Sequence, residues 1–183
     1  WDGNPGVIIY ADHTFNTLTA ECDITGLRVL DFGCGTGNLS QKMAKTAKNI
    51  VALDTSSKMI SILSAKEIDN VTPLSMELSP PVIKNNEALI EKFDLIIASS
   101  VFAFVDDFEE TLGLLKGLLK SGGKLLQWDW LAKDDEGDFG FSKERLELAY
   151  SNAGFKNINI TQPFSLEKAH GSMKVIMCVA SVS

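Results

Sequence analysis

The chain has 183 residues, 45% of them apolar and 22% charged, which is the composition of a folded globular protein rather than of a disordered or fibrous one. A net charge of −7 argues against a nucleic-acid-binding surface, because neutralising phosphates requires clustered Lys and Arg. The 3 cysteines have the spacing of neither a disulfide framework nor a zinc site, so we expect a reducing compartment and no metal.

No apolar run approaches the roughly 18 residues that span a bilayer, and the chain does not open on a secretory signal pattern. We therefore expect a cytoplasmic protein without membrane or nucleic-acid partners. The length fits a single domain, residues 1–183, acting as a monomer or homodimer.

Apolar residues at helical spacing first predict a helix within Pro5–Cys22, lying across one end of a sheet. Apolar runs rich in β-branched residues then alternate with helical periodicity, which is typical of a mostly parallel sheet. The predicted strands are Leu27–Phe32, Ile50–Leu53, Val71–Met76, Phe93–Ser99, Gly123–Trp128, Phe155–Thr161 and Met173–Ser181. A helix is expected over Asp106–Lys120, and another begins at Ser142 and ends near Gly154.

A glycine-rich turn follows the first predicted strand, in the order Asp31-Phe32-Gly33-Cys34-Gly35-Thr36-Gly37. Glycine lets the backbone turn sharply and approach a ligand where a Cβ atom would collide. A tight strand-to-helix turn without a ligand is the alternative. Cys34 is expected to pack as a small apolar residue rather than to react.

Asp54 directly follows the second predicted strand and lies 21 residues after Gly33. An acidic residue at this spacing reaches the ribose hydroxyls in nucleoside-binding βαβ units. The alternative is that Asp54 caps the helix beginning near Ser56, and the two roles are compatible.

The segments Leu30–Gly37, Ala52–Ser56, Met59-Ile60, Phe93–Ser100 and Leu118–Leu125 together resemble class I, Rossmann-like S-adenosylmethionine-dependent methyltransferases of the small-molecule type. The resemblance implies an α/β fold: a three-layer Rossmann-like sandwich with a seven-stranded, mostly parallel sheet, helices on both faces and an antiparallel last strand. It also implies an N-terminal helical lid over residues 1–22, a cofactor-binding core over residues 27–131, and a C-terminal helix with the last strands over residues 132–183.

The cofactor implied by this resemblance is S-adenosyl-L-methionine. Asp31 and the backbone of the glycine turn would hold its methionine part, Asp54 its ribose, and Thr55 and Met59 would border the adenosine. Glu77-Leu78 stands near the adenine, where the family more often has Asp-Ala. The cofactor-binding residues so implied are Asp31, Gly33, Cys34, Gly35, Gly37, Asp54, Thr55, Met59, Glu77, Leu78, Ser99 and Ser100.

Candidates for contact with a small-molecule methyl acceptor are Tyr10, His13, Phe104, Asp129 and Trp130, whereas Trp128 is read as core. Many relatives carry a His soon after the fourth strand, but here the stretch Val101–Val105 has none. His13 and His170 are the other possible bases, although a lone His is more often structural. No catalytic residue is assigned, because alignment of the acceptor with an activated methyl group supplies much of the rate.

The glycines and proline near the start predict a hinged lid over residues 1–16, with Trp1 and Tyr10 covering the nucleoside. The acidic run Asp134–Asp138 reads as a solvated loop. The predicted function is methyl transfer to a small molecule by in-line displacement. The alternatives are a non-catalytic S-adenosylmethionine-binding module and an NAD-dependent oxidoreductase, whose Gly-x-Gly-x-x-Gly fingerprint the glycine turn does not match.

Overall fold

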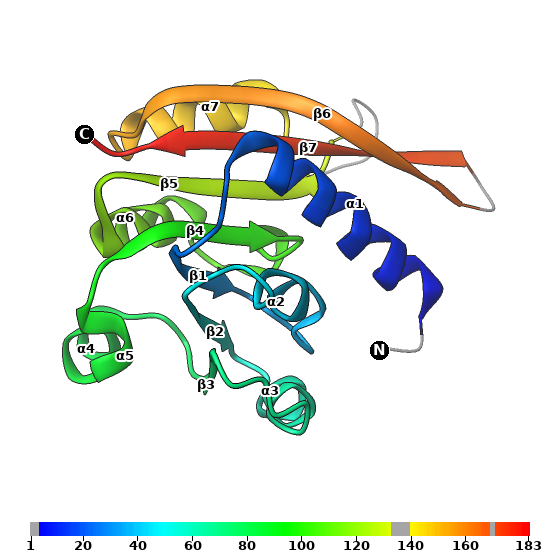
Figure 1. The fold of residues 1–183 in the computed structure, drawn as a ribbon. Helices are drawn as coiled ribbons and strands as arrows, with labels where there is room; N and C mark the ends of the chain where they lie inside the picture. Colours follow the sequence, from blue (N-terminus) through cyan, green and yellow to red (C-terminus); the bar gives the residue numbers. More distant parts are fainter. Residues whose placement is uncertain (1–3, 133–139, 169–170) are drawn as a thin grey trace.

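The computed structural model describes residues 4–132, 140–168 and 171–183. Trp1, His170 and the acidic run Asp134–Asp138 lie outside these residues. The described residues form one seven-stranded sheet with the order β3-β2-β1-β4-β5-β7-β6 (Figure 1). The strands are β1 (Arg28–Phe32), β2 (Asn49–Asp54), β3 (Val71–Ser75), β4 (Phe93–Ser99), β5 (Leu119–Trp130), β6 (Lys156–Lys168) and β7 (Gly171–Ser181).

The sheet is parallel from β3 to β5, and β7 runs antiparallel to both of its neighbours, β5 and β6. The central strands β1, β2 and β4 are apolar along almost their whole length and buried, as expected for strands covered on both faces. The predicted fold class, including the antiparallel last strand, is therefore confirmed.

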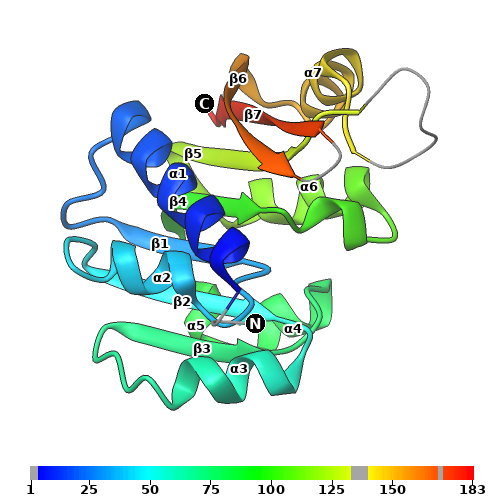
Figure 2. The same cartoon turned by 90° about the vertical axis from the view of Figure 1, so that its right-hand side faces the viewer.

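Helices cover both faces of the sheet, each over its own apolar core (Figure 2). One face carries α1 (Pro5–Glu21), α2 (Asn38–Met43) and α3 (Ser57–Ser64). The other carries α4 (Pro80–Asn85), α5 (Glu87–Ile90), α6 (Phe108–Leu118) and α7 (Lys143–Asn152). The short helices α4 and α5 and the 3₁₀ helix η1 (Phe102–Phe104) were not expected from the sequence.

Capping side chains set the starts of five described helices, three of which are the longest ones on the two faces. The N-cap residues Asn4 of α1, Asp107 of α6 and Ser142 of α7 each accept a backbone N–H from the first turn, and the prediction for Ser142 is confirmed. The C-terminal end predicted for α6 was wrong by two residues. The helix stops at Leu118 because β5 already begins at Leu119, which pairs with Phe93 of β4.

Strand β6 runs seven residues beyond the predicted end at Thr161, to Lys168. The ladder to β7 shifts register between Thr161 and Phe164, and Pro163, which has no N–H to donate, lies in this irregularity. The predicted strand ends two residues before Pro163, but the pairing continues past this proline. The extension places Phe164 against Tyr10 of α1, with ring centroids 5.6 Å apart.

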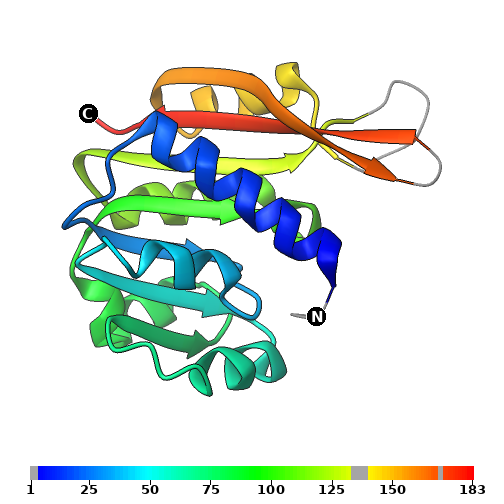
Figure 3. The ribbon, with the colours of Figure 1, turned by 45° about the vertical axis from the view of Figure 1, so that its right-hand side comes forward.

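Helix α1 crosses the sheet obliquely on the α2 side (Figure 3). Its C-terminal half is anchored by Leu18, which is fully buried, and by Thr17, whose hydroxyl accepts the indole N–H of Trp128 at 2.9 Å. Asp12 pairs with Lys42 of α2. Trp128 is fully buried, as expected. None of the described helices is long and apolar enough to cross a membrane.

Candidate functional site

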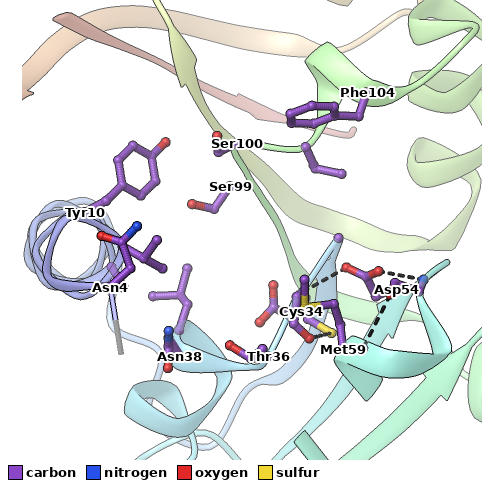
Figure 4. A pocket seen from close by; sticks show the side chains of 18 of the residues that line it. Asn4, Tyr10, Cys34, Thr36, Asn38, Asp54, Met59, Ser99, Ser100 and Phe104 are labelled. Carbon is purple, nitrogen blue, oxygen red and sulfur yellow. Dashed lines mark hydrogen bonds between the residues drawn. The ribbon is translucent and has the colours of Figure 1, made fainter. Parts of the chain in front are cut away.

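A cavity of about 780 Å³ opens at the carboxyl edge of the sheet (Figure 4). It lies over the ends of β1 and β4, where the strand order reverses, which is the point at which open α/β sheets bind ligands. The described lining residues are Asn4, Gly6, Val7, Tyr10, Ala11, Asp31, Gly33, Cys34, Gly35, Thr36, Asn38, Leu39, Asp54, Thr55, Ser56, Met59, Ser99, Ser100, Val101, Phe104, Trp130 and Leu166.

The glycine turn is held against β2 by hydrogen bonds from the Gly33 and Cys34 N–H groups to the Leu53 carbonyl, at 2.8 and 3.0 Å. Gly33 has φ +71°, and a Cβ atom there would come within 2.2 Å of Val101 Cγ2. A Cβ atom at Gly35 would enter open space, so the backbone at this point of the cavity is free to be approached by a ligand.

Asp54 links the glycine turn to the start of α3. Its Oδ2 accepts the Gly35 N–H and its Oδ1 accepts the Ser56 N–H, both at 2.8 Å. The helix cap itself is Ser56, whose hydroxyl accepts the Met59 N–H at 3.4 Å, and Asp54 holds this cap residue in place. Each carboxylate oxygen can accept a further hydrogen bond, and Asp54 lines the cavity, so a role toward a ligand remains open to the same side chain.

Asp31 lines the cavity beside the glycine turn and is almost fully buried. Its Oδ2 accepts the hydroxyl of Ser40. Burial raises the pKa of Asp31 to about 6, with a further contribution from the negative charge of Asp54. Burial, together with the charges of Asp31 and Asp54, also raises the pKa of the Cys34 thiol, so this residue stays neutral and is not an activated nucleophile.

The opposite side of the cavity is built by α1, the end of β4, η1 and the end of β5. Tyr10 packs on Trp130 with ring centroids 5.3 Å apart, and Phe104 faces the cavity with 78% of its surface exposed. Ser99 and Ser100 lie between these walls (Figure 4). Ser100 has φ +55°, which is uncommon for a residue other than glycine, and its N–H donates to the Trp128 carbonyl at 2.7 Å.

Five candidate residues do not line this cavity. Gly37 lies in the turn with φ +78°, close to Leu63. Glu77 is exposed just after β3, and the neighbouring Leu78 packs against the core on the α4 side. His13 is exposed on α1 and stacks on Phe164, with ring centroids 5.0 Å apart.

Asp129, the fifth of these, is fully buried near the end of β5. Tyr150 donates its hydroxyl to Gln127 Oε1, and Gln127 Nε2 donates to Asp129 Oδ2, both at 2.9 Å. Asp129 Oδ1 has no hydrogen-bond partner among the described residues. Burial raises the pKa of Asp129 to about 7.

Sequence reasoning missed several lining residues. Thr36, Asn38 and Leu39 continue the glycine turn and could have been inferred from their position next to it. Val7 and Ala11 lie one helical turn from one another on α1, on the same side as Tyr10. Leu166 gave no sequence signal, because it reaches the cavity only through the extension of β6.

Comparison with known proteins places this geometry in a family. Residues 10–170 match the model of a family described as "Methyltransferase domain". An uncharacterised methyltransferase of Schizosaccharomyces pombe is 29% identical over 133 residues, which are 64% of this chain and 47% of that protein. A ubiquinone biosynthesis O-methyltransferase of Cereibacter sphaeroides is 30% identical over 109 residues, covering 60% of this chain and 43% of the relative. The chain thus spans less than half the length of these relatives.

The crystal structure of an S-adenosylmethionine-dependent methyltransferase from Aquifex aeolicus has the same fold. It superposes with a TM-score of 0.72 over 98% of this chain and 94% of the other, at 20% identity. The fold and the site define the class, which is that of the Rossmann-like S-adenosylmethionine-dependent methyltransferases. The chain belongs to the methyltransferase-domain family, as its sequence segments indicated, and the cofactor of this class is S-adenosyl-L-methionine.

Proposed function

We propose that this chain binds S-adenosylmethionine in the cavity at the carboxyl edge and transfers its methyl group to a small-molecule acceptor. The observation that carries the proposal is the meeting of Asp31, the glycine turn and Asp54 along one side of a cavity whose other side has space for a second molecule. The volume of about 780 Å³ is in the range of sites that enclose a small ligand.

The residues on the cofactor side suit the parts of S-adenosylmethionine. Asp54 would accept hydrogen bonds from the ribose hydroxyls, and Asp31 would face the ammonium group of the methionine part, whose positive charge favours the ionised carboxylate. The open backbone at Gly35 lets the ligand lie against the turn. Thr55 and Met59 would border the adenosine. When bound, the cofactor supplies a methyl group activated by its sulfonium.

The protein's contribution to the reaction is to align the acceptor and to exclude water. The bound cofactor would supply the methyl group, with the electron pair of the sulfur–carbon bond left on sulfur. The proton of an N–H or O–H acceptor would pass to solvent, since no residue is assigned as a base. Tyr10, Ser99, Ser100, Phe104 and Trp130 surround the space in which this acceptor would lie. The net charge of −7 supports a small molecule rather than a nucleic acid as acceptor.

Calorimetry with S-adenosylhomocysteine and with NAD tests the proposed cofactor, and a turnover assay with a broad acceptor panel tests the chemistry. We expect micromolar binding of S-adenosylhomocysteine and no response to NAD. Tight binding of NAD with no response to S-adenosylhomocysteine would contradict the proposal. Binding of S-adenosylhomocysteine without turnover on any acceptor would favour the non-catalytic binding module.

A further inference from the structure

The acceptor side of the cavity differs in charge from the cofactor side. Asp31 and Asp54 are the charged residues among the described lining residues, and both belong to the cofactor side. On the acceptor side, the described lining residues offer aromatic rings, hydroxyls and aliphatic groups. A charged acceptor would be desolvated there without a counter-charge from these residues, which is unfavourable.

Flat apolar surfaces bound the acceptor side. The Trp130 ring packs against the Tyr10 ring. Tyr10 also makes an edge-to-face contact with Phe164, and this contact supports the Tyr10–Trp130 pair. Phe104 stands across the cavity from Tyr10 with 78% of its surface exposed (Figure 4). An aromatic ring bound between these walls would bury the exposed face of Phe104 and stack against aromatic side chains.

A group of hydroxyls lies at the inner end of this space. The Tyr10 hydroxyl is buried and points away from α1 toward Ser100 (Figure 4). It interacts with the hydroxyls of Thr14, Ser99 and Ser100, but none of these contacts has full hydrogen-bond geometry. Thr14 lies one helical turn along α1, behind the residues that line the cavity. Leaving such a group unsatisfied costs free energy that a ligand oxygen would recover.

Two further observations concern Tyr10 and Ser100. Burial and the nearby charge of Asp129 raise the pKa of Tyr10, so its hydroxyl remains protonated. Ser100 is held in an uncommon left-handed conformation by its hydrogen bond to the Trp128 carbonyl, and such conformations concentrate at functional sites.

We propose that the acceptor is an uncharged aromatic molecule with an oxygen substituent, held between Phe104 and the Tyr10–Trp130 pair with its oxygen hydrogen-bonded to the Tyr10 hydroxyl. This inference rests on the proposed function, because it assigns the space beside the cofactor to the acceptor. Phe104 selects for a flat shape, and Tyr10 selects for the oxygen.

The test measures binding of four probes to the S-adenosylhomocysteine complex, in which the sulfonium charge of S-adenosylmethionine is absent. The probes are 2-naphthol, naphthalene, decahydro-2-naphthol and 2-naphthoate, which vary the oxygen, the flatness and the charge in turn. We expect 2-naphthol to bind about tenfold more tightly than each of the others, the ratio that a difference of about 1.4 kcal/mol produces. Equal or tighter binding of 2-naphthoate, or no measurable binding of 2-naphthol, would overturn the inference.

Two variants test which residues cause the preference for 2-naphthol. Phe104→Ala should weaken 2-naphthol about tenfold, whereas the control Leu148→Ala, which removes an apolar side chain that is 64% exposed on α7, should leave it unchanged. Tyr10→Phe should abolish the preference for 2-naphthol over naphthalene. If Phe104→Ala and Tyr10→Phe leave 2-naphthol binding as it is, the proposed site is wrong.

Binding of S-adenosylhomocysteine is measured in every variant. If the wild-type protein does not bind it, the proposed function fails. If it binds normally and the probes show no preference, only the inference about the acceptor fails.

Discussion

Asp54 shows how one side chain can serve both the fold and a ligand. Its carboxylate accepts two backbone N–H groups, from Gly35 and Ser56, and it also lines the cavity. The sequence indicated a ribose ligand or a helix cap at this position and could not show that the same carboxylate also ties down the glycine turn, because that bond spans 19 residues of chain.

We predict that Asp54→Ala weakens binding of S-adenosylhomocysteine by roughly 1.5 to 3 kcal/mol, the range for hydrogen bonds to a charged group, and also lowers the ligand-free melting temperature. The stability loss follows from the two backbone N–H groups that the variant leaves without their acceptor. Calorimetry well below the melting temperature separates the two effects. An unchanged melting temperature would show that neither backbone bond contributes to stability.

Asp129 makes the stability of the folded protein depend on pH. Its pKa is raised to about 7 in the folded state, against about 3.9 for an unperturbed Asp. The stabilising contribution of the protonated carboxyl is complete below pH 4 and is lost as the pH rises to 7, because the unfolded chain ionises first.

We predict that Asp129→Asn, which keeps the shape but cannot ionise, becomes more stable relative to wild type as the pH rises from 5 to 8, by on the order of a few kcal/mol at most. Denaturant unfolding at several pH values measures this difference. Asp106→Asn, at an exposed aspartate, is the matched control and should show no such trend. A constant difference for Asp129→Asn would mean that Asp129 is already ionised at pH 5.

At the scale of elements, the glycine turn combines a backbone requirement with close packing. Gly37 has φ +78°, and a Cβ atom there would come within 2.3 Å of Leu63 Cδ1 of α3. Gly26 has nearly the same φ, +73°, but a Cβ atom there would meet nothing within 4 Å. Comparing Gly37 with Gly26 therefore separates the free-energy cost of the left-handed backbone from that of the clash with Leu63.

We predict that Gly37→Ala destabilises the protein by about 2 to 5 kcal/mol, the sum of left-handed strain and overpacking. Gly26→Ala should cost only the strain, about 1 to 2 kcal/mol. Gly113→Ala, in the middle of α6 with open space around it, should stabilise by roughly 0.5 to 1 kcal/mol. Chemical denaturation measures all three, and equal losses for Gly37→Ala and Gly26→Ala would show that Leu63 moves aside freely.

At the scale of the whole molecule, α1 is anchored at one end and reaches the cavity at the other. Its C-terminal half is held by the buried Leu18 and by the hydrogen bond between Thr17 and Trp128. Its N-terminal half lines the cavity through Asn4, Gly6 and Val7. Closure of the site would therefore involve residues 4–9, which precede the packed Tyr10.

We predict that S-adenosylhomocysteine slows hydrogen exchange of residues 4–9 severalfold and leaves residues 14–21 and α6 unchanged. The reason is that the ligand adds contacts to the exposed start of α1, whereas Tyr10 and the residues after it are already packed. Hydrogen exchange with and without the ligand measures it. Equal exchange of residues 4–9 in both states would make α1 a fixed cover rather than a lid.

The sequence by itself determined the fold class, the order of the seven strands along the chain, and the glycine turn with Asp31 and Asp54 that lines one side of the cavity. Those features depend on local patterns: buried strands of β-branched residues, a glycine turn, and an acidic residue at a fixed distance after it. Each can be read within a window of about 25 residues.

Only the tertiary structure decided which side chains form the acceptor side. Tyr10, Ser100, Phe104, Trp130 and Leu166 come from five segments that pair or pack only in the folded chain. The same holds for Asp129, a candidate for the acceptor side that lies buried in a network with Gln127 and Tyr150 instead. The side of the sheet that a residue faces depends on strand register and bulges, such as the shift at Pro163 that carries β6 to the cavity, and these are set by long-range packing.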